Sequence, residues 1–360
     1  MSSDFLIVGG GVIGLSIARE LRRRGAGKIA VVDKGRIGSE ASWAAAGMLA
    51  PNAECHAADV LFRLCNESNR MYPQFAEELL HETGNDIELD RSGTLSLSFD
   101  DEGGAALAET YRWQREAGIP VEWLSVEDVL KLEPQLSSLV QTALFYPNDW
   151  QVENRKLIAA LRRYCELNAI ELVENAAVTE LVAERDRLLG VRTGEGVLAA
   201  GTIILAAGAW TSRLTGDSIP AVKPIRGQMI SLAGGERRLN SVVYSSDAYI
   251  VPRLDGRVLV GATVEDDGFN KTVTEEAIGV LKSAANRMAP FLAGCTIESA
   301  WAGLRPFADG GMPVVGRLPE VANAFVATGH YRNGILLAPI TARMIADQIR
   351  VGSSVEVNAA

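Results

Sequence analysis

The stretch "FLIVGGGVIGLSIA", residues 5–18, decides the fold class of this chain. Its first four residues form a continuous apolar run, which is typical of a strand buried on both faces. Gly9, Gly11 and Gly14 then make a G-x-G-x-x-G that opens a helical pattern of apolar residues. The run "KIAVVD", residues 28–33, predicts a second strand that ends in an acid. Together these features indicate a dinucleotide-binding βαβ unit.

Each glycine of this turn has a physical role. Gly9 permits the tight turn, Gly11 lets a pyrophosphate approach the backbone, and Gly14 lets the helix pack close to the strand. The first helical residues, Val12 and Ile13, belong to a helix N-terminus that offers free N–H groups and a partial positive charge. We therefore expect phosphates to bind here.

The acid at the end of the second strand selects among dinucleotides. Asp33, followed by Lys34, is placed to accept hydrogen bonds from a ribose diol, and its charge disfavours the 2′-phosphate of NADP. Small residues follow in "GRIGSEASWAAAGMLAP", residues 35–51, and they let the backbone press against a pyrophosphate and a flat ring. The candidate cofactor-binding residues in this segment are Ala41, Ser42, Ala46, Gly47 and Met48.

Composition limits the function further. A chain of 360 residues with 48% hydrophobic and 22% charged residues predicts a soluble globular protein of about two domains. The formal net charge of −10 argues against nucleic acid as a partner. The four cysteines lack the spacing of a zinc site or a disulfide framework, which favours the cytoplasm. We expect neither a targeting segment nor a membrane span, because three glycines interrupt the apolar N-terminus.

The rest of the chain alternates between two patterns. Amphipathic helices are predicted over 66–83, 104–118 and 154–168, and period-2 strands dominate from about residue 216 to 325. The predicted fold class is α/β, with a Rossmann-type cofactor-binding domain interleaved with an α+β substrate domain that carries a mainly antiparallel sheet. The expected cofactor-binding domain comprises residues 1–85, 145–215 and 325–360, and the expected substrate-binding domain comprises residues 86–144 and 216–324.

The segment "SWAAAGM", residues 42–48, resembles the loop that covers FAD in the glycine oxidase and D-amino-acid oxidase family of flavoproteins. The resemblance extends over essentially the whole chain and is closest to the glycine oxidases of thiamine biosynthesis. It implies FAD as the cofactor. It also implies noncovalent binding, because Cys295, the one late cysteine, lies in a context unlike that of the relatives that attach FAD covalently.

The same resemblance assigns further positions. Arg305 matches the arginine that pairs with the substrate carboxylate in the family. Tyr249 matches the tyrosine whose hydroxyl assists that contact, and Arg332 matches a position beside the substrate amine. A helix beginning near Gly334 would point its N-terminus at the flavin, and His330 would serve only through its backbone. The additional positions expected to contact the cofactor are Val178, Gly208, His330, Tyr331, Arg332, Asn333, Gly334, Ile335 and Leu336.

The implied reaction is FAD-dependent oxidative deamination of glycine, related small amines or D-amino acids. Hydride transfer would give an imine, then glyoxylate and ammonia, with dioxygen reduced to hydrogen peroxide. Two residues depart from the family pattern: Val264 stands where a methionine is usual, and Asp247 where a histidine is usual. The smaller Val264 would widen the pocket, and Asp247 would favour a protonated amine, so the choice among glycine, sarcosine and small D-amino acids stays open.

Two other functions remain as alternatives. A D-amino-acid dehydrogenase that passes electrons to a quinone would need a membrane-facing basic or apolar element, which the sequence does not suggest. A non-catalytic flavin-binding protein would not need Tyr249, Arg305 and Arg332 together. Family resemblance also suggests a homo-oligomer, often a tetramer.

Overall fold

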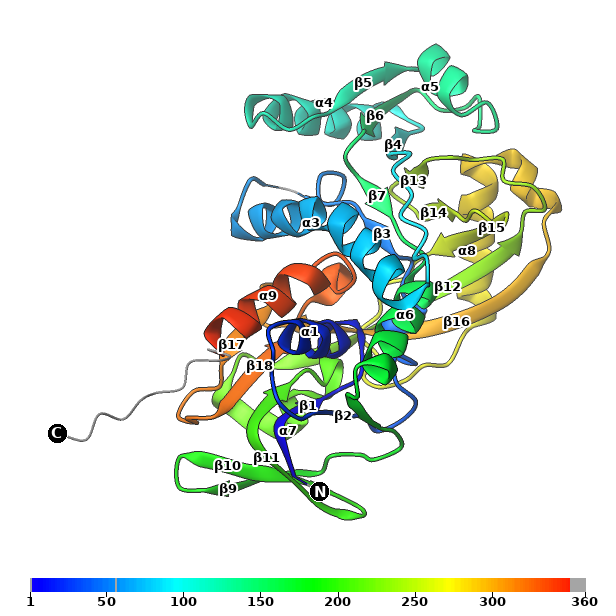
Figure 1. The fold of residues 1–360 in the computed structure, drawn as a ribbon. Coiled ribbons are helices and arrows are strands. Elements are labelled where there is room, and N and C mark those ends of the chain that lie inside the picture. The colour runs from blue at the N-terminus through cyan, green and yellow to red at the C-terminus, as the bar shows by residue number, and fades with distance from the viewer. Residues whose placement is uncertain (1, 56, 350–360) are drawn as a thin grey trace.

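The computed structural model describes residues 2–55 and 57–349, and Figure 1 shows two large sheets with helices packed on them. This is the α/β architecture predicted from the sequence, with a Rossmann-type unit and a mainly antiparallel second sheet. Residue 1 and residues 350–360, which the sequence analysis assigns to the cofactor-binding domain, lie outside the described residues.

The first sheet is parallel through its centre, where β1 is flanked by β2 and β11. A hairpin of β9 and β10 extends it from β11, and β17 joins it antiparallel to β18. Along the main path of the sheet and then the hairpin, its strands are β17 (Val314–Arg317), β18 (Ala324–Thr328), β11 (Gly196–Leu205), β1 (Ser2–Val8), β2 (Ile29–Val32), β8 (Glu171–Val173), β10 (Arg187–Thr193) and β9 (Glu180–Glu184).

The central strand β1 is buried on both faces, as its apolar run predicts. Ile7 packs into the cluster beneath the helices, whereas Leu6 and Val8 pack into the cluster on the opposite face. Because neighbouring side chains on a strand point to opposite faces, a strand covered on both sides must be apolar throughout.

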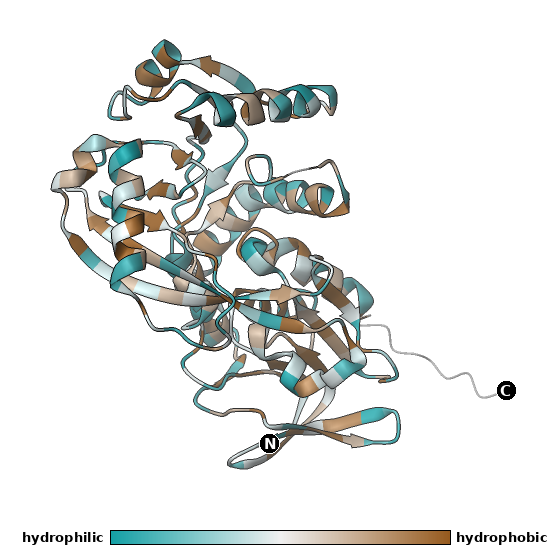
Figure 2. Cartoon of the chain, turned by 180° about the vertical axis from the view of Figure 1, so that it is seen from behind, coloured by the Kyte–Doolittle hydropathy of each residue, from teal (hydrophilic) through white to brown (hydrophobic). Residues whose placement is uncertain are grey.

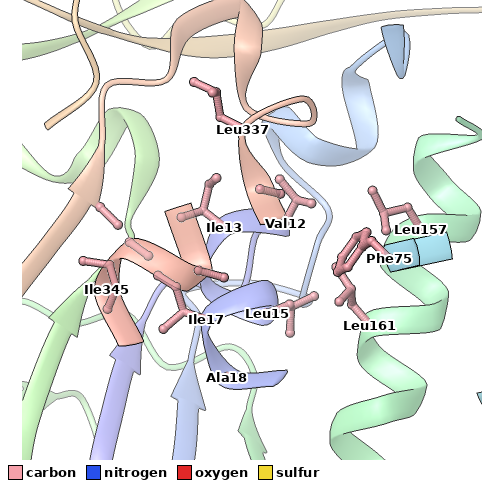
Figure 3. Close-up of a cluster of buried hydrophobic side chains, with 14 of the residues drawn as sticks. Val12, Ile13, Leu15, Ile17, Ala18, Phe75, Leu157, Leu161, Leu337 and Ile345 are labelled. Atoms are coloured by element: carbon pink, nitrogen blue, oxygen red, sulfur yellow. The ribbon is translucent and has the colours of Figure 1, made fainter. Parts of the chain in front are cut away.

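One face of the first sheet is covered by helices that meet around the glycine-rich turn. These helices are α1 (Val12–Arg23), α3 (Val60–Thr83), α6 (Asn154–Leu167) and α9 (Ala338–Gln348). Figure 3 shows how α1 contributes Val12, Leu15 and Ile17 to a cluster with residues of the other three, including Phe75 and Ile345. This packing buries about as much of α1 as a helix can bury, so its position on the sheet is fixed.

Two helices begin earlier than the sequence analysis predicts. The helix expected from residue 66 begins at Val60, because the Asp59 side chain accepts a hydrogen bond of 2.8 Å from the Phe62 N–H. The helix expected from residue 104, α4 (Asp101–Glu116), begins three residues before that point, where Asp100 caps it. Aspartates at these positions satisfy N–H groups that the first turn leaves without a helical partner.

The second sheet is antiparallel except where β13 runs parallel to β4. Helix α8 (Glu275–Met288) packs on one face, and α4 and α5 (Val126–Leu132) pack near β5 and β6. In spatial order its strands are β16 (Ile297–Ala308), β12 (Val222–Ala233), β15 (Arg257–Gly261), β14 (Tyr249–Pro252), β13 (Val242–Tyr244), β4 (Thr94–Ser98), β6 (Thr142–Tyr146) and β5 (Glu122–Ser125).

The two sheets are joined by long strands. Strands β12 and β16 reach toward the first sheet and contact the turn at Gly208–Trp210 that follows β11, just ahead of α7 (Ser212–Thr215). A short sheet of β3 (Met48–Leu49) and β7 (Trp150–Gln151) lies between them, preceded in the chain by α2 (Ala41–Ala44). Strand β17 lies within residues 216–324, which the sequence analysis assigns to the substrate-binding domain. In the structure β17 pairs with β18 of the first sheet.

Figure 2 shows hydrophilic and hydrophobic residues alternating along the outer helices, as amphipathic surface helices require. Across residues 2–55 and 57–349, no helix combines the length and the apolar character that a membrane crossing needs.

Candidate active site

The turn between β1 and α1 is built so tightly that only glycine fits at two of its positions. Gly9 has a φ of +111°, and a Cβ there would lie 2.2 Å from the Ala206 carbonyl oxygen. A Cβ on Gly14 would lie 1.9 Å from the Gly9 carbonyl oxygen. The helix therefore starts in direct contact with the end of the sheet.

The N-terminus of α1 borders a cavity, and no side chain of the helix's own first turn caps it. Its N-cap residue, Gly11, makes no side-chain hydrogen bond, and the first turn contains no acid. The Val12 N–H donates to the Ser42 hydroxyl at 2.9 Å, which ties the helix to α2. A helix start whose one side-chain partner is a neutral hydroxyl and whose first turn has no acid is suited to an anionic ligand.

Asp33 is held by the backbone at the end of β2. Its Oδ2 accepts a hydrogen bond from the Gly10 N–H at 2.7 Å, and its Oδ1 accepts one from the Gly35 N–H at 2.9 Å. Burial raises the pKa of Asp33, and these two hydrogen bonds oppose the rise. Each oxygen keeps a second lone pair, so the proposed contact with a ribose diol stays compatible with this geometry.

Lys34 lies in a cluster with an acid, an aromatic ring and a second lysine, which the sequence does not suggest. Its Nζ pairs with Glu40 at 2.8 Å and lies 3.6 Å from the centre of the Trp210 ring. Lys271, from the loop after β15, pairs with the same Glu40 at 3.0 Å. The loop that carries Lys271 thus closes over this end of the cavity.

The small-residue segment forms one wall and is fixed from behind. Gly47 has a φ of +73°, and a Cβ there would lie 2.0 Å from the Val152 carbonyl oxygen. Arg253 of the second sheet donates to the Ala46 carbonyl oxygen at 2.9 Å and to that of Val152 at 2.8 Å. Burial lowers the pKa of Arg253 to about 10. Both Nη atoms of this arginine are thus committed to the segments that form the wall, which ties the second sheet to them.

At the opposite end, Arg305 of β16 extends along the floor of the cavity. Its Nη1 donates to the Thr263 carbonyl oxygen at 3.0 Å. The guanidinium occupies the space above Gly227, where a Cβ would lie 2.2 Å from Nη1. The residue is in an extended strand ahead of Pro306, as the sequence predicts.

Tyr249 of β14 lies next to this guanidinium. Burial raises the pKa of Tyr249, and the nearby positive charge and hydrogen bond of Arg305 oppose the rise. A Cβ on Gly261 would lie 2.6 Å from the Tyr249 hydroxyl oxygen, so the absence of a side chain there makes room for the phenol. Tyr249 and Val251 face the same side of the sheet, as period-2 alternation predicts.

The segment from Gly329 to Ile335 passes along the cavity from β18. Residues Tyr331–Asn333 form a 3-10 turn, and Tyr331 has a φ of +48°. The α-helix expected near Gly334 begins at Ala338, because this turn and the residues after it come first. The expectation that a helix N-terminus starts at Gly334 is therefore wrong.

The His330 side chain lies beneath this turn and is hydrogen-bonded to Thr341. Its side chain is buried, and Nε2 is 3.0 Å from the Thr341 hydroxyl. Burial lowers the pKa of His330 to about 4, so the ring is neutral at physiological pH. This setting agrees with a position that serves the site through its backbone.

A cavity of about 800 Å³ brings these segments together between the two sheets. Two predicted residues do not line it: Gly14 packs the helix, and the Leu336 carbonyl oxygen accepts a hydrogen bond from Ser68. The predicted residues that do line it are Gly9, Gly11, Val12, Ile13, Asp33, Lys34, Ala41, Ser42, Ala46, Gly47, Met48, Val178, Gly208, Tyr249, Arg305, His330, Tyr331, Arg332, Asn333, Gly334 and Ile335.

Sequence reasoning missed two polar side chains at the substrate end. Glu54 lines the cavity, and its carboxyl group accepts a hydrogen bond from the Tyr244 hydroxyl. Tyr244 lies five residues before Tyr249 and packs against it, with ring centres 5.6 Å apart. The spacing of Tyr244 and Tyr249 around a predicted hairpin could have indicated that the two tyrosines lie together. No pattern in the sequence around Glu54 predicts that it faces a cavity.

Comparison with known proteins shows which family this chain belongs to. Residues 4–348 match the family model described as "DAO: FAD dependent oxidoreductase". A glycine oxidase from Pseudomonas putida is 36% identical over 96% of this chain and 94% of its own. A bifunctional protein ThiO/ThiG from Trichormus variabilis is 37% identical over 97% of this chain and 53% of its own.

A solved structure agrees with these sequence matches. The crystal structure of glycine oxidase from Geobacillus kaustophilus superposes with a TM-score of 0.92 and 34% identity, covering 97% of this chain and 94% of that one. The glycine turn, Asp33 and the cavity between the sheets fall within the matched residues. The chain belongs to the DAO family of FAD-dependent oxidoreductases.

Proposed function

We propose that this chain oxidises glycine and related small amines or D-amino acids. In the full reaction glycine, dioxygen and water give glyoxylate, ammonia and hydrogen peroxide. The observation that carries the proposal is that Arg305 and Tyr249 lie together in the cavity that the glycine turn opens into. A carboxylate-binding arginine in reach of a dinucleotide site is what an amino-acid oxidase requires.

The nucleotide end of the cavity fits FAD. Gly9 and Gly11 leave backbone where side chains would obstruct a pyrophosphate, the start of α1 is free of acids, and Asp33 offers carboxylate oxygens to a ribose. Bound FAD supplies a hydride acceptor at the flavin and passes the electrons to dioxygen. The walls at Gly47 and at residues 330–335 would then hold the ring system, and no covalent link is expected.

The substrate end fits an amino-acid carboxylate. Arg305 lines the cavity, and the backbone oxygens that it contacts are bonded to one of its nitrogens, which leaves the others for a carboxylate. Paired donors of a guanidinium bind a carboxylate in a defined plane. The Tyr249 hydroxyl would complete the grip. Holding the substrate by its carboxylate fixes the Cα hydrogen, and such orientation supplies about 7–11 kcal/mol toward a reaction barrier.

Arg332 lines the cavity on the side of residues 330–335 and would lie beside the substrate amine. The two departures from the family pattern bear on the choice of amine. Val264 lines the cavity and is 53% exposed, which leaves room for an N-methyl group or a short D-side chain. Asp247 also lines the cavity. Its carboxylate forms an ion pair with Arg287 at 3.0 Å, so its effect on a bound amine is offset by that positive charge.

The cellular role is proposed on the same basis. The relatives named above include a bifunctional ThiO/ThiG protein, which supports a role in supplying thiamine biosynthesis. Four free cysteines suit a reducing cytoplasm. A homo-oligomer is expected, and size-exclusion chromatography with light scattering would measure its mass.

The decisive experiment is peroxide release from purified protein given glycine, sarcosine, D-alanine or D-proline. Rapid peroxide formation with at least one of these amines is expected. A flavin that each amine reduces without air, but that air reoxidises only slowly, would instead indicate a dehydrogenase. Protein without a flavin spectrum would refute the proposal altogether.

Replacement of Arg305 tests the carboxylate contact. Arg305→Ala removes charge-assisted hydrogen bonds worth about 1.5–3 kcal/mol each, so the KM for the best substrate is expected to rise at least tenfold. Arg192→Ala, on the hairpin strand β10, is a matched control that removes an arginine whose side chain pairs with Glu180 and does not line the cavity. An unchanged KM in Arg305→Ala would exclude the assigned role.

A further inference from the structure

We infer that Glu54 binds the ammonium group of the substrate and makes the site specific for zwitterions over simple carboxylic acids. The inference rests on the proposed function and names a residue that the sequence comparison did not. It follows from the position of Glu54, from the charges around the cavity, and from the buried network that holds its loop.

The position of Glu54 places a carboxyl group at the substrate end of the cavity, which Arg305 also lines. Its carboxyl group accepts a hydrogen bond from the Tyr244 hydroxyl, and the Tyr244 ring packs on that of Tyr249. The proximity is also electrostatic: the charge of Glu54 contributes to raising the pKa of Tyr244 after burial, while Arg332 opposes it. Glu54, the tyrosine pair and Arg305 therefore border one compartment.

The other acids that line the cavity have partners away from the tyrosine pair. Asp33 is bonded to the backbone at the nucleotide turn, Glu40 pairs with Lys34 and Lys271 there, and Asp247 pairs with Arg287. Of the acids that line the described cavity, Glu54 is the one that the structure shows hydrogen-bonded to a tyrosine of the pair. An amino acid carries a carboxylate and an ammonium group on one carbon, and this compartment offers a partner for each.

A buried network fixes the loop that presents Glu54. Asp149, which is fully buried, accepts hydrogen bonds from the Asn52 side-chain amide at 2.6 Å and from the Ala53 N–H at 2.7 Å. Gln114 donates to the Asn52 carbonyl oxygen at 2.9 Å, and the Tyr146 hydroxyl donates to Gln114 at 3.0 Å. The two residues directly before Glu54 are therefore held from below, so Asp149 is a positioning residue for it.

This arrangement predicts different behaviour for two kinds of ligand. A zwitterion gains a charge-assisted hydrogen bond to Glu54, whereas a ligand with a carboxylate but no ammonium group gains nothing and meets a like charge. The carboxyl group also favours the protonated form of the bound amine. Since hydride transfer needs the neutral amine, Glu54 would set the pH at which turnover reaches half its maximum.

The test compares glycine with glycolate, which replaces the ammonium group by a hydroxyl. In Glu54→Gln the KM for glycine is expected to rise about 10- to 100-fold, as loss of a hydrogen bond between charged groups implies. The inhibition constant of glycolate should stay the same or fall. The rising limb of the kcat against pH curve should move to lower pH.

Three further variants keep the test interpretable. Glu180→Gln on β9 removes a negative charge outside the cavity and should match the wild type. Glu54→Asp retains the carboxylate on a side chain that is shorter by one methylene group. Its KM for glycine should therefore lie between those of the wild type and Glu54→Gln. Asp149→Asn should raise the KM for glycine while its flavin spectrum shows an intact fold.

Two results would overturn the inference alone: a glycine KM in Glu54→Gln within twofold of the wild type, or a glycolate inhibition constant that rises in parallel with that KM. A wild-type protein that oxidises none of the amines would overturn the proposed function, and this inference with it.

Discussion

The two ends of the cavity are made in opposite ways. The nucleotide end is shaped by missing side chains, because Gly9, Gly14 and Gly47 let backbone approach backbone within distances that a Cβ would prevent. The substrate end is shaped by long polar side chains that reach in from separate segments, Arg305 and Glu54 among them. Added atoms should therefore damage the first end, and removed atoms should damage the second.

The largest effect is expected from adding a methyl group at the nucleotide end. In Gly14→Ala the new Cβ would lie 1.9 Å from the Gly9 carbonyl oxygen, which forces α1 away from β1. We expect protein that purifies without FAD, measured as the ratio of flavin to protein absorbance. Gly35→Ala is the control, since its nearest neighbour would be the Ser39 hydroxyl at 3.9 Å, and it should stay yellow. A fully loaded Gly14→Ala would refute the steric account.

A second prediction concerns Arg253, the arginine that holds the small-residue wall from behind. Arg253→Met leaves the carbonyl oxygens of Ala46 and Val152 without their guanidinium donor in a buried position. Breaking such a buried polar cluster costs about 3–5 kcal/mol, so the urea midpoint should fall sharply. Arg192→Met is the surface comparison and should change it little. Equal midpoints for the two variants would mean that Arg253 does not fix the wall.

The third prediction uses pH. The pKa of His330 is about 4 in the folded protein against an ordinary 6.5, so its unfolded form binds a proton first as pH falls below 6.5. Stability from this group is complete above pH 6.5 and is lost between pH 6.5 and 4. By linkage the loss at pH 5 is about 2 kcal/mol.

The comparison is between wild type and His330→Gln, by urea unfolding at pH 7 and at pH 5. The wild type should lose more stability than the variant by the amount given above. If both lose the same amount, His330 is not held neutral in the folded protein.

The smallest effect is expected from removing one hydroxyl at the nucleotide end. Ser42→Ala deletes the acceptor of the Val12 N–H, a neutral hydrogen bond worth about 0.5–1.5 kcal/mol. FAD affinity, measured by recovery of flavin fluorescence on dilution, should fall only a few-fold. Ser39→Ala, whose hydroxyl bonds to Arg36 on the surface, should leave it unchanged. A loss as complete as that of Gly14→Ala would erase the contrast between the two ends.

The same contrast explains what could be predicted from the sequence. The strand, glycine turn and second strand lie within the first 33 residues, and local sterics require their residue types, so the fold class follows from the residues alone. Arg305 and Tyr249 sit on separate strands of another sheet, and only family resemblance paired them. Glu54 had no local signal, because its loop is fixed by Asp149, a residue distant in sequence.

The start of α9 was misplaced for a related reason. Apolar residues continue from Ile335 without a capping residue, so the pattern looks helical from Gly334 onward. The left-handed Tyr331 lies in a 3-10 turn that packs against β16, where His330 bridges Phe307, and sequence periodicity does not reveal this long-range contact.

The cavity also has a consequence for synthesis on the ribosome. Its walls come from segments far apart in the sequence, with Gly9 in the turn after β1 and Ile335 just ahead of α9. A nascent polypeptide can form the first βαβ unit early, but the site that encloses FAD is complete only when nearly the whole chain has emerged. Until α9 arrives, α1 lacks one of the helices that cover it. The complete cofactor cavity therefore forms only after α9 has been synthesised.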